Sequence, residues 1–183
     1  MTISHGWNGP VKAEPDFEQL LKVLRREAPD RPTLFEFFHN GPLYNVLAAG
    51  GDAAPGSPEQ TVIAFRNAGY DYATILPSDY HFPGGEHHNE QTISLNEGNV
   101  ITDRASFEAY EWPDPATASF APLERAAAVL PEGMKIISQG PGGVLENIIG
   151  LVGFDNLCFL LADDPELTKA IFDAVGARLV AFY

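Results

Sequence analysis

The sequence predicts an α/β fold that forms the N-terminal part of a (β/α)8 TIM barrel, with about three parallel strands and surrounding helices. Three short apolar runs are separated by long segments of helical periodicity, an order that makes the strands parallel. Three such strands cannot close a barrel, and the last helix ends on apolar residues without a polar cap. We therefore expect roughly the first three β-α units of a larger barrel. A small three-stranded domain, or one that dimerises to complete its sheet, is the alternative.

The first β-α unit follows a loose lead-in over residues 1–15, and the barrel domain is expected over residues 16–183. Apolar residues recur at helical spacing from Asp16, a candidate N-cap. Residues 33–38 are apolar apart from one glutamate and are expected to form the first strand. A helix over residues 42–49 follows, because proline suits a first helical turn.

The second unit predicts a helix over residues 58–68, which Gly69 ends. Residues 73–76 then form a short apolar run, as expected of a buried parallel strand. Pro77 ends this strand because it cannot donate to a ladder. The remaining expected elements are a short strand at 91–95, helices over 106–110 and 123–130, a third strand at 134–138, and helices up to Leu151, over 157–161 and from 165 to 183.

Composition limits the range of functions. The chain has 183 residues, 45% of them hydrophobic, and a formal net charge of -14. Such an acidic surface repels nucleic acid and anionic membranes, so we expect neither as a partner. The single Cys158 excludes an intramolecular disulfide and a multi-cysteine metal site within this chain. A secretory signal and a long apolar span are both missing from the sequence, so a cytoplasmic location is expected.

Polar and titratable residues follow the second expected strand directly. Ser78, Asp79, Tyr80 and His81 occupy the position at which α/β proteins place their chemistry, beyond the carboxyl end of a strand. The alternative is that Asp79 caps a turn or a short helix, as aspartate after Pro-Ser readily does.

Four segments resemble the uroporphyrinogen decarboxylase superfamily, and most closely its divergent decarboxylase-like branch. They are Pro-Asp-Arg-Pro at 29–32, Phe-Arg-Asn-Ala-Gly-Tyr-Asp-Tyr at 65–72, residues 101–115, and Gly-Pro-Gly-Gly-Val-Leu-Glu-Asn at 140–147. The resemblance extends from Phe17 onward but covers only the N-terminal half of a family member. It implies a (β/α)8 barrel related to porphyrinogen decarboxylases and to methyltransferases that act with corrinoid proteins and thiols.

The family's functional residues are matched only in part. Ser78 and Asp79 match a Ser-Asp pattern whose aspartate, in the decarboxylases, positions pyrrole nitrogens. The arginine-rich motif after the first strand is replaced by residues 38–43, which retain only its glycine. Arginine forks are suited to clamp carboxylates, so their loss in an acidic chain argues against uroporphyrinogen as substrate. Residues 140–148 also lack the family's Trp and Tyr.

A pocket at the strand rim is the expected site. Its expected residues are Asp79 and Glu146 for catalysis, and His39, Asn40, Ser78, His81 and Gly140 for substrate binding. Glu146 is interpreted either as an acid or base or as a carboxylate that the helix dipole favours. Residues 140–143 suit an anion cradle but also an ordinary tight turn.

The metal content and the reaction stay open at this point. Glu86, His87 and His88 are candidate metal ligands, although adjacent histidines point different ways and often lie simply at the surface. The resemblance implies zinc and a corrinoid protein partner for a methyltransferase, and no cofactor for a decarboxylase. We expect methyl transfer or a related reaction on a small-molecule substrate. A homodimer is compatible with this expectation. Porphyrinogen decarboxylation and a non-catalytic fragment or binding module are the alternatives.

Overall fold

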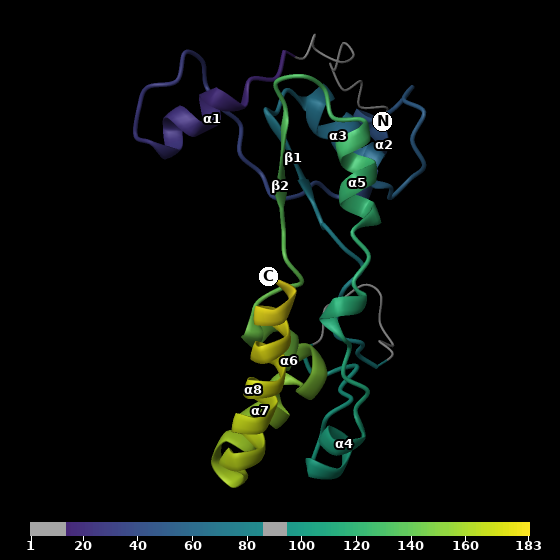
Figure 1. The fold of residues 1–183 in the computed structure, drawn as a ribbon, viewed down its shortest axis with the longest axis vertical. Helices are drawn as coiled ribbons and strands as arrows, with labels where there is room; N and C mark the ends of the chain where they lie inside the picture. Colours follow the sequence, from purple (N-terminus) through teal and green to yellow (C-terminus); the bar gives the residue numbers. More distant parts are fainter. Residues whose placement is uncertain (1–13, 86–94) are drawn as a thin grey trace, which may run out of the picture. The chain divides into compact units, whose positions relative to one another are not determined.

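The computed structural model describes residues 14–85 and 95–183, which form a mixed α/β fold of two compact units (Figure 1). The first, here called the sheet unit, contains the described residues up to Ser78 together with Phe120–Gln139. The second, the helical unit, contains those of Asp79–Ser119 and Gly140–Tyr183. Each unit has a hydrophobic core of its own, so each is described separately.

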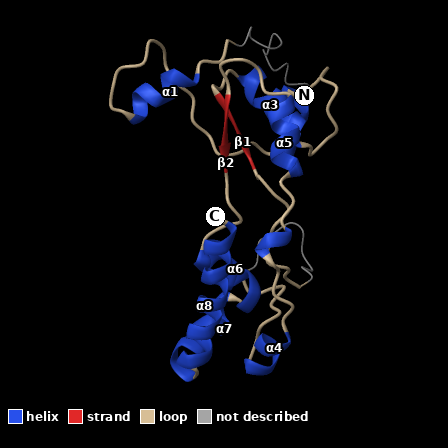
Figure 2. Cartoon of the chain, viewed as in Figure 1, coloured by secondary structure: helices blue, strands red, loops and turns tan. Residues whose placement is uncertain are grey.

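The sheet unit is built on two parallel strands, drawn in red in Figure 2. Strand β1 (Tyr72–Ile75) pairs with β2 (Lys135–Ser138) in a register that sets Tyr72 opposite Lys135. All four residues of β1 are buried, as expected of a strand that helices cover. The second and third expected strands, and their parallel order, are thus confirmed.

The first expected strand, over residues 33–38, is wrong. The segment joins no ladder in the described structure. The Tyr72 hydroxyl instead donates to the Glu36 carbonyl at 2.7 Å and accepts from the Glu36 N–H at 2.6 Å. Strand formation requires a neighbouring backbone, and here a side chain takes both backbone groups. The expected strand at 91–95 lies outside the described residues apart from its last position.

Four helices complete the sheet unit: α1 (Phe17–Leu24), α2 (Gly41–Leu47), α3 (Pro58–Ala68) and α5 (Ala121–Ala128). Their ends follow from local chemistry. In α3, the Ser57 hydroxyl accepts from the Gln60 N–H at 3.1 Å, and Pro58 occupies the first turn. Gly69 ends the helix in the left-handed conformation, at φ +90°. Helix α3 packs against β1 and α5, and its Phe65 is fully buried in the core.

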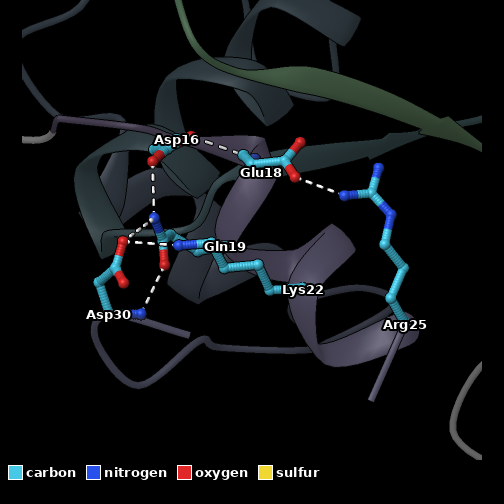
Figure 3. Close-up of polar contacts among 6 residues, drawn as sticks. All are labelled: Asp16, Glu18, Gln19, Lys22, Arg25 and Asp30. Carbon is cyan, nitrogen blue, oxygen red and sulfur yellow. Dashed lines mark hydrogen bonds and ion pairs between the residues drawn. The ribbon is translucent and has the colours of Figure 1, made fainter. Parts of the chain in front are cut away.

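Helix α1 is hydrogen-bonded to the segment that precedes β2, near the amino ends of the strands. The Phe17 N–H donates to the carbonyl of Gly133, just before β2, at 2.9 Å. Figure 3 shows how its first turn is held: the Gln19 amide donates to Asp16 at 2.8 Å and to Asp30 at 3.1 Å. The Asp30 N–H returns a bond to Gln19 at 2.8 Å. Capping by Asp16, expected from the sequence, is confirmed.

The helical unit contains α4 (Arg104–Ala109), a short 3-10 turn (Pro115–Thr117), α6 (Val144–Val152), α7 (Phe154–Asp163) and α8 (Pro165–Phe182). Its core gathers Ile101, Leu151 and Ile171, and the Arg178 guanidinium lies 4.5 Å from the centre of the Trp112 ring. Among the described helices, none is by itself long and apolar enough to cross a membrane; α6 and α7 meet that test only as a pair bent by 96°.

Candidate functional site

A pocket of about 540 Å³ opens at the carboxyl ends of the two strands, entirely within the sheet unit. It is lined by Phe37, Phe38, Tyr44, Gly56, Pro58, Thr61, Thr74, Ile75, Leu76, Ser78, Pro122, Arg125 and Gln139. Carboxyl ends of parallel strands are where α/β proteins bind ligands, because loops vary there above a rigid floor. This rim pocket is therefore the candidate site.

The connectivity of the chain explains why α3 and α5 contribute to the rim pocket. Each helix precedes one strand and runs opposite to it, so the first turn of the helix reaches the carboxyl end of the strand. Pro58 and Thr61 come from the first turn of α3, and Pro122 from that of α5, whereas Arg125 lies in the last turn of this short helix. Two helix starts and two strand ends thus meet in one place.

Aromatic rings form much of the remaining wall. Phe37 and Phe38 are 52% and 71% exposed, a large apolar area to leave in water. Tyr44 is half-buried, and its hydroxyl accepts from the backbone N–H of His39 at 3.1 Å. Such rings suit a flat, apolar ligand body, which stacks on aromatic faces and edges.

Polar groups at the strand ends complete the rim pocket. The Gln139 N–H donates to the Ile75 carbonyl at 3.0 Å, which ties the two strand ends together and places both residues on the wall. Within the described residues, the buried hydroxyl oxygen of Thr74 has no hydrogen-bond partner. Leaving such a group unpaired costs about 1–3 kcal/mol, so a hydrogen bond from a ligand to the Thr74 hydroxyl would be favourable.

One ion pair stands at the rim pocket. Arg125 Nε and Nη2 donate to the two carboxylate oxygens of Glu59, each at 2.8 Å, so the pair is bidentate. The guanidinium lowers the pKa of Glu59, and the carboxylate raises the pKa of Arg125. The charge of the one arginine on the pocket wall, among the described residues, is thereby balanced.

Three of the expected substrate-binding residues, all from the sheet unit, have mixed placements. Ser78 lines the rim pocket. Asn40 caps α2, its Oδ1 accepting from the Leu43 N–H at 2.9 Å. The His39 ring packs 4.6 Å from the Phe65 ring, between Tyr44 and Tyr70, and burial lowers its pKa. His39 and Asn40 therefore serve packing and capping, whereas their position after the first expected strand had favoured substrate contact.

The expected residues after Ser78 belong to the helical unit. Asp79 is exposed, its Oδ1 accepts from the Ser119 N–H at 2.9 Å, and its own N–H donates back at 3.3 Å. His81 is also exposed, with Nδ1 at 2.9 Å from the Asp79 carbonyl. Asp79 thus pairs with a backbone segment 40 residues further along the chain. Because His39 and Asp79 lie in separately described units, their convergence stays a prediction.

Glu146 and Gly140 lie near the start of α6. A side chain at Gly143 would collide with the Glu146 carboxylate, which therefore folds over the first turn of its own helix. A carboxylate in the first turn of a helix is favoured by the helix dipole. A side chain at Gly140 would overlap the Tyr183 hydroxyl, so glycine permits a close approach of α8.

Metal ligands are not assembled in the part of the chain that the structure describes, where no three His, Cys, Asp or Glu side chains lie close enough to hold an ion. Glu86, His87 and His88 lie outside the described residues. The donors that are described do not fit the zinc that the resemblance implies.

Sequence reasoning missed most of the rim pocket wall. Tyr44, Thr61, Arg125 and Gln139 were not among the expected site residues, although the rule that helix starts adjoin strand ends points to Thr61.

Comparison of the chain with protein-family models, with characterised proteins and with solved structures finds no match.

Two of the segments that resemble the decarboxylase superfamily, at 29–32 and 65–72, have structural roles here. Arg31, from Pro-Asp-Arg-Pro, forms a bidentate pair with the buried Asp71, with one contact at 3.1 Å and a second between Nη2 and Oδ1. Asp71 also accepts from the Asp16 N–H at 2.8 Å, and Asn67 donates to the Leu47 carbonyl at 2.8 Å. Both motifs connect elements of the sheet unit at the end opposite the rim pocket. They stabilise the fold and are not part of the candidate site.

Proposed function

We propose that the chain is the N-terminal part of a (β/α)8 barrel enzyme of the uroporphyrinogen decarboxylase superfamily, and that the rim pocket binds the small-molecule substrate of a methyl-transfer or related reaction. The observation that supports this most is the pocket's position at the carboxyl ends of two parallel strands. The motif order from Phe17 to Asn147 supports the family.

The charges around the rim pocket favour methyl transfer over porphyrinogen decarboxylation. A porphyrinogen carries many carboxylates, which need several free guanidinium groups to hold them. Arg125, the cation of the described wall, is already committed to Glu59 at 2.8 Å through both oxygens. A methyl-bearing substrate with an uncharged heteroatom suits the aromatic rings and the few polar groups instead.

Residues of this chain would bind and orient the substrate. Phe37, Phe38 and Tyr44 would cover its apolar body and exclude water from it, and the polar ends of the strands would fix its direction. Asp79 stays the proposed acid or orienting group, and Glu146 a second candidate. A corrinoid protein partner remains part of the proposal through the resemblance alone, and no step is assigned to it or to zinc, which the described donors do not fit.

Binding of a small uncharged methyl thioether tests the proposal. Binding of 4-(methylthio)benzyl alcohol would be measured by saturation-transfer NMR. Binding of uroporphyrin I, an octacarboxylate, would be measured separately by fluorescence titration. We expect the thioether to bind and uroporphyrin not to bind. Tight binding of uroporphyrin without binding of the thioether would overturn the proposal in favour of a porphyrinogen site.

Two variants locate that binding. Thr61→Phe places a ring in the rim pocket, whereas Ala127→Phe adds the same ring at an exposed position of α5 outside the pocket wall. We expect the first to abolish thioether binding and the second to leave it unchanged. Equal effects would mean that the ligand binds elsewhere.

A further inference from the structure

We propose that Glu59 is a specificity-determining residue: by holding Arg125, it makes the rim pocket select uncharged ligands and reject carboxylates. The inference rests on the proposed function, because it takes the rim pocket to be a ligand site. It goes further by naming the ligand's charge class and the residue that sets it. Glu59 was not among the residues that the sequence singled out.

Glu59 occupies one edge of the Arg125 guanidinium. Its two contacts, from Nε and Nη2, are each 2.8 Å long, the bidentate arrangement that a ligand carboxylate would otherwise take on that edge. Arg125 lines the rim pocket, while Glu59 follows Pro58, another wall residue, at the start of α3. Glu59 is not on the pocket wall itself, so it neutralises the arginine of the wall from a position next to it.

Glu59 is the more firmly held partner. Its side chain is 22% exposed, whereas that of Arg125 is 54% exposed. It also lies in the first turn of α3, where the helix dipole favours a negative charge. The hydrogen bond from Arg125 and a backbone contact in that turn both lower the pKa of Glu59, so the carboxylate is ionised at neutral pH. An incoming carboxylate must therefore compete for the guanidinium charge with an anion that its own helix stabilises.

The surrounding charge reinforces this selection. The chain has a formal net charge of -14, so a carboxylate approaching the rim pocket meets repulsion from the whole molecule. A purely structural role for the pair, joining α3 to α5, would leave ligand selection unchanged when Glu59 is neutralised. The two roles thus differ in what they predict for ligands.

A matched pair of probes tests the proposal. The neutral 4-(methylthio)benzyl alcohol and the anionic 4-(methylthio)benzoate share their ring and methyl thioether and differ mainly in charge. Dissociation constants would be measured by NMR titration for the wild-type chain, Glu59→Gln and the double variant Glu59→Gln/Arg125→Gln. Thermal unfolding of each variant would establish that it is folded.

We expect the wild-type chain to bind the alcohol at least tenfold more tightly than the benzoate, as an order of magnitude for one charge-assisted contact. Glu59→Gln should gain roughly tenfold for the benzoate with the alcohol little changed, and the double variant should lose that gain. A benzoate affinity that does not rise in folded Glu59→Gln, or a wild-type chain that binds both probes equally, would overturn the inference. Failure of the wild-type chain to bind either probe would instead refute the proposed function.

Discussion

The ion pair between Arg31 and Asp71 shows how single residues hold the sheet unit together. The Asp71 side chain is 3% exposed and the Arg31 side chain 39% exposed, so the two partners differ in their access to water. Asp71 receives the guanidinium and the Asp16 N–H at once, which ties the lead into α1 to the start of β1. A buried carboxylate depends on such partners, because without them its desolvation is uncompensated.

Removing the two partners should therefore have unequal effects. Arg31→Met leaves the buried carboxylate without its counter-charge and should lower the free energy of unfolding by about 2–3 kcal/mol, less than for a fully buried pair. Asp71→Asn keeps an acceptor for Asp16 and frees an arginine that reaches water, so it should cost about 1 kcal/mol. Urea titrations followed by circular dichroism measure both. The reverse order of the two effects would contradict this account.

His39 gives the sheet unit a dependence on pH. Burial among aromatic rings lowers its pKa, and the nearby Glu36 opposes that shift only in part. The folded state therefore binds a proton less readily than the unfolded state, whose histidine titrates near its ordinary value of about 6.5. The stabilising effect of the neutral ring is present above that value and is lost as the pH falls toward the lowered pKa of the folded state.

The variant His39→Phe isolates this effect from the many carboxylates of the chain. We expect the wild-type free energy of unfolding to decrease more than that of His39→Phe when the pH falls from 7.5 to 5. The quantity to compare is the difference between these two decreases, obtained from urea titrations at both pH values. Parallel decreases in the two proteins would mean that His39 is as solvated in the folded state as in the unfolded state.

At the scale of elements, local chemistry sets where the helices begin and end. Ser57, Pro58 and Gly69 bound α3 at the positions that the sequence predicts, and Asp16 caps α1. Gly69 adopts φ +90°, a conformation that costs other residues steric energy, although no atom lies within 4 Å of an added Cβ. Gly150, inside α6, has the same open surroundings without a positive φ.

These two glycines should respond in opposite directions to the same substitution. Gly69→Ala should destabilise the sheet unit by about 1 kcal/mol because alanine resists the left-handed conformation. Gly150→Ala should stabilise α6 by about 0.5–1 kcal/mol because alanine is the better helix former. Thermal unfolding of the two variants gives the comparison, and a destabilised Gly150→Ala would show that its surroundings are not open.

The helices and the two paired strands were predictable because their signals are local: caps, glycine stops and short apolar runs. The segment Thr33–Phe38 carries the same apolar signal, yet its outcome depends on whether a neighbouring backbone is present. In the candidate site, the strand-end rule found Ser78. Thr61 and Arg125 lie far from it in sequence and reach it only through the packing of α3 and α5, which the sequence pattern does not specify.

At the scale of the whole molecule, the described residues of the two units pack around separate hydrophobic cores. Phe65 and Tyr72 belong to the core of the sheet unit, and Ile171 with Leu151 to that of the helical unit. Units with separate cores open separately in native-state exchange, because the apolar packing that holds one unit closed does not hold the other. The rim pocket, contained in the sheet unit, should then tolerate damage to the helical unit.

Ile171→Ala tests this independence. Ile171 is fully buried, so the cavity should cost the helical unit about 2–5 kcal/mol. Hydrogen-exchange mass spectrometry should show faster exchange in α6 and α8 and unchanged protection in β1 and β2. Equal loss of protection in both units would mean that the chain unfolds as one cooperative body.

The most direct test of the central claim is to map where 4-(methylthio)benzyl alcohol binds. Amide chemical shifts of the isotopically labelled chain would be followed during a titration with this probe. The account predicts saturable shifts concentrated at Thr74–Ser78, at Gln139 and in the first turns of α3 and α5. Shifts confined to α6 and α8, or no saturable shifts at all, would contradict the claim that the strand ends of the sheet unit form a ligand site.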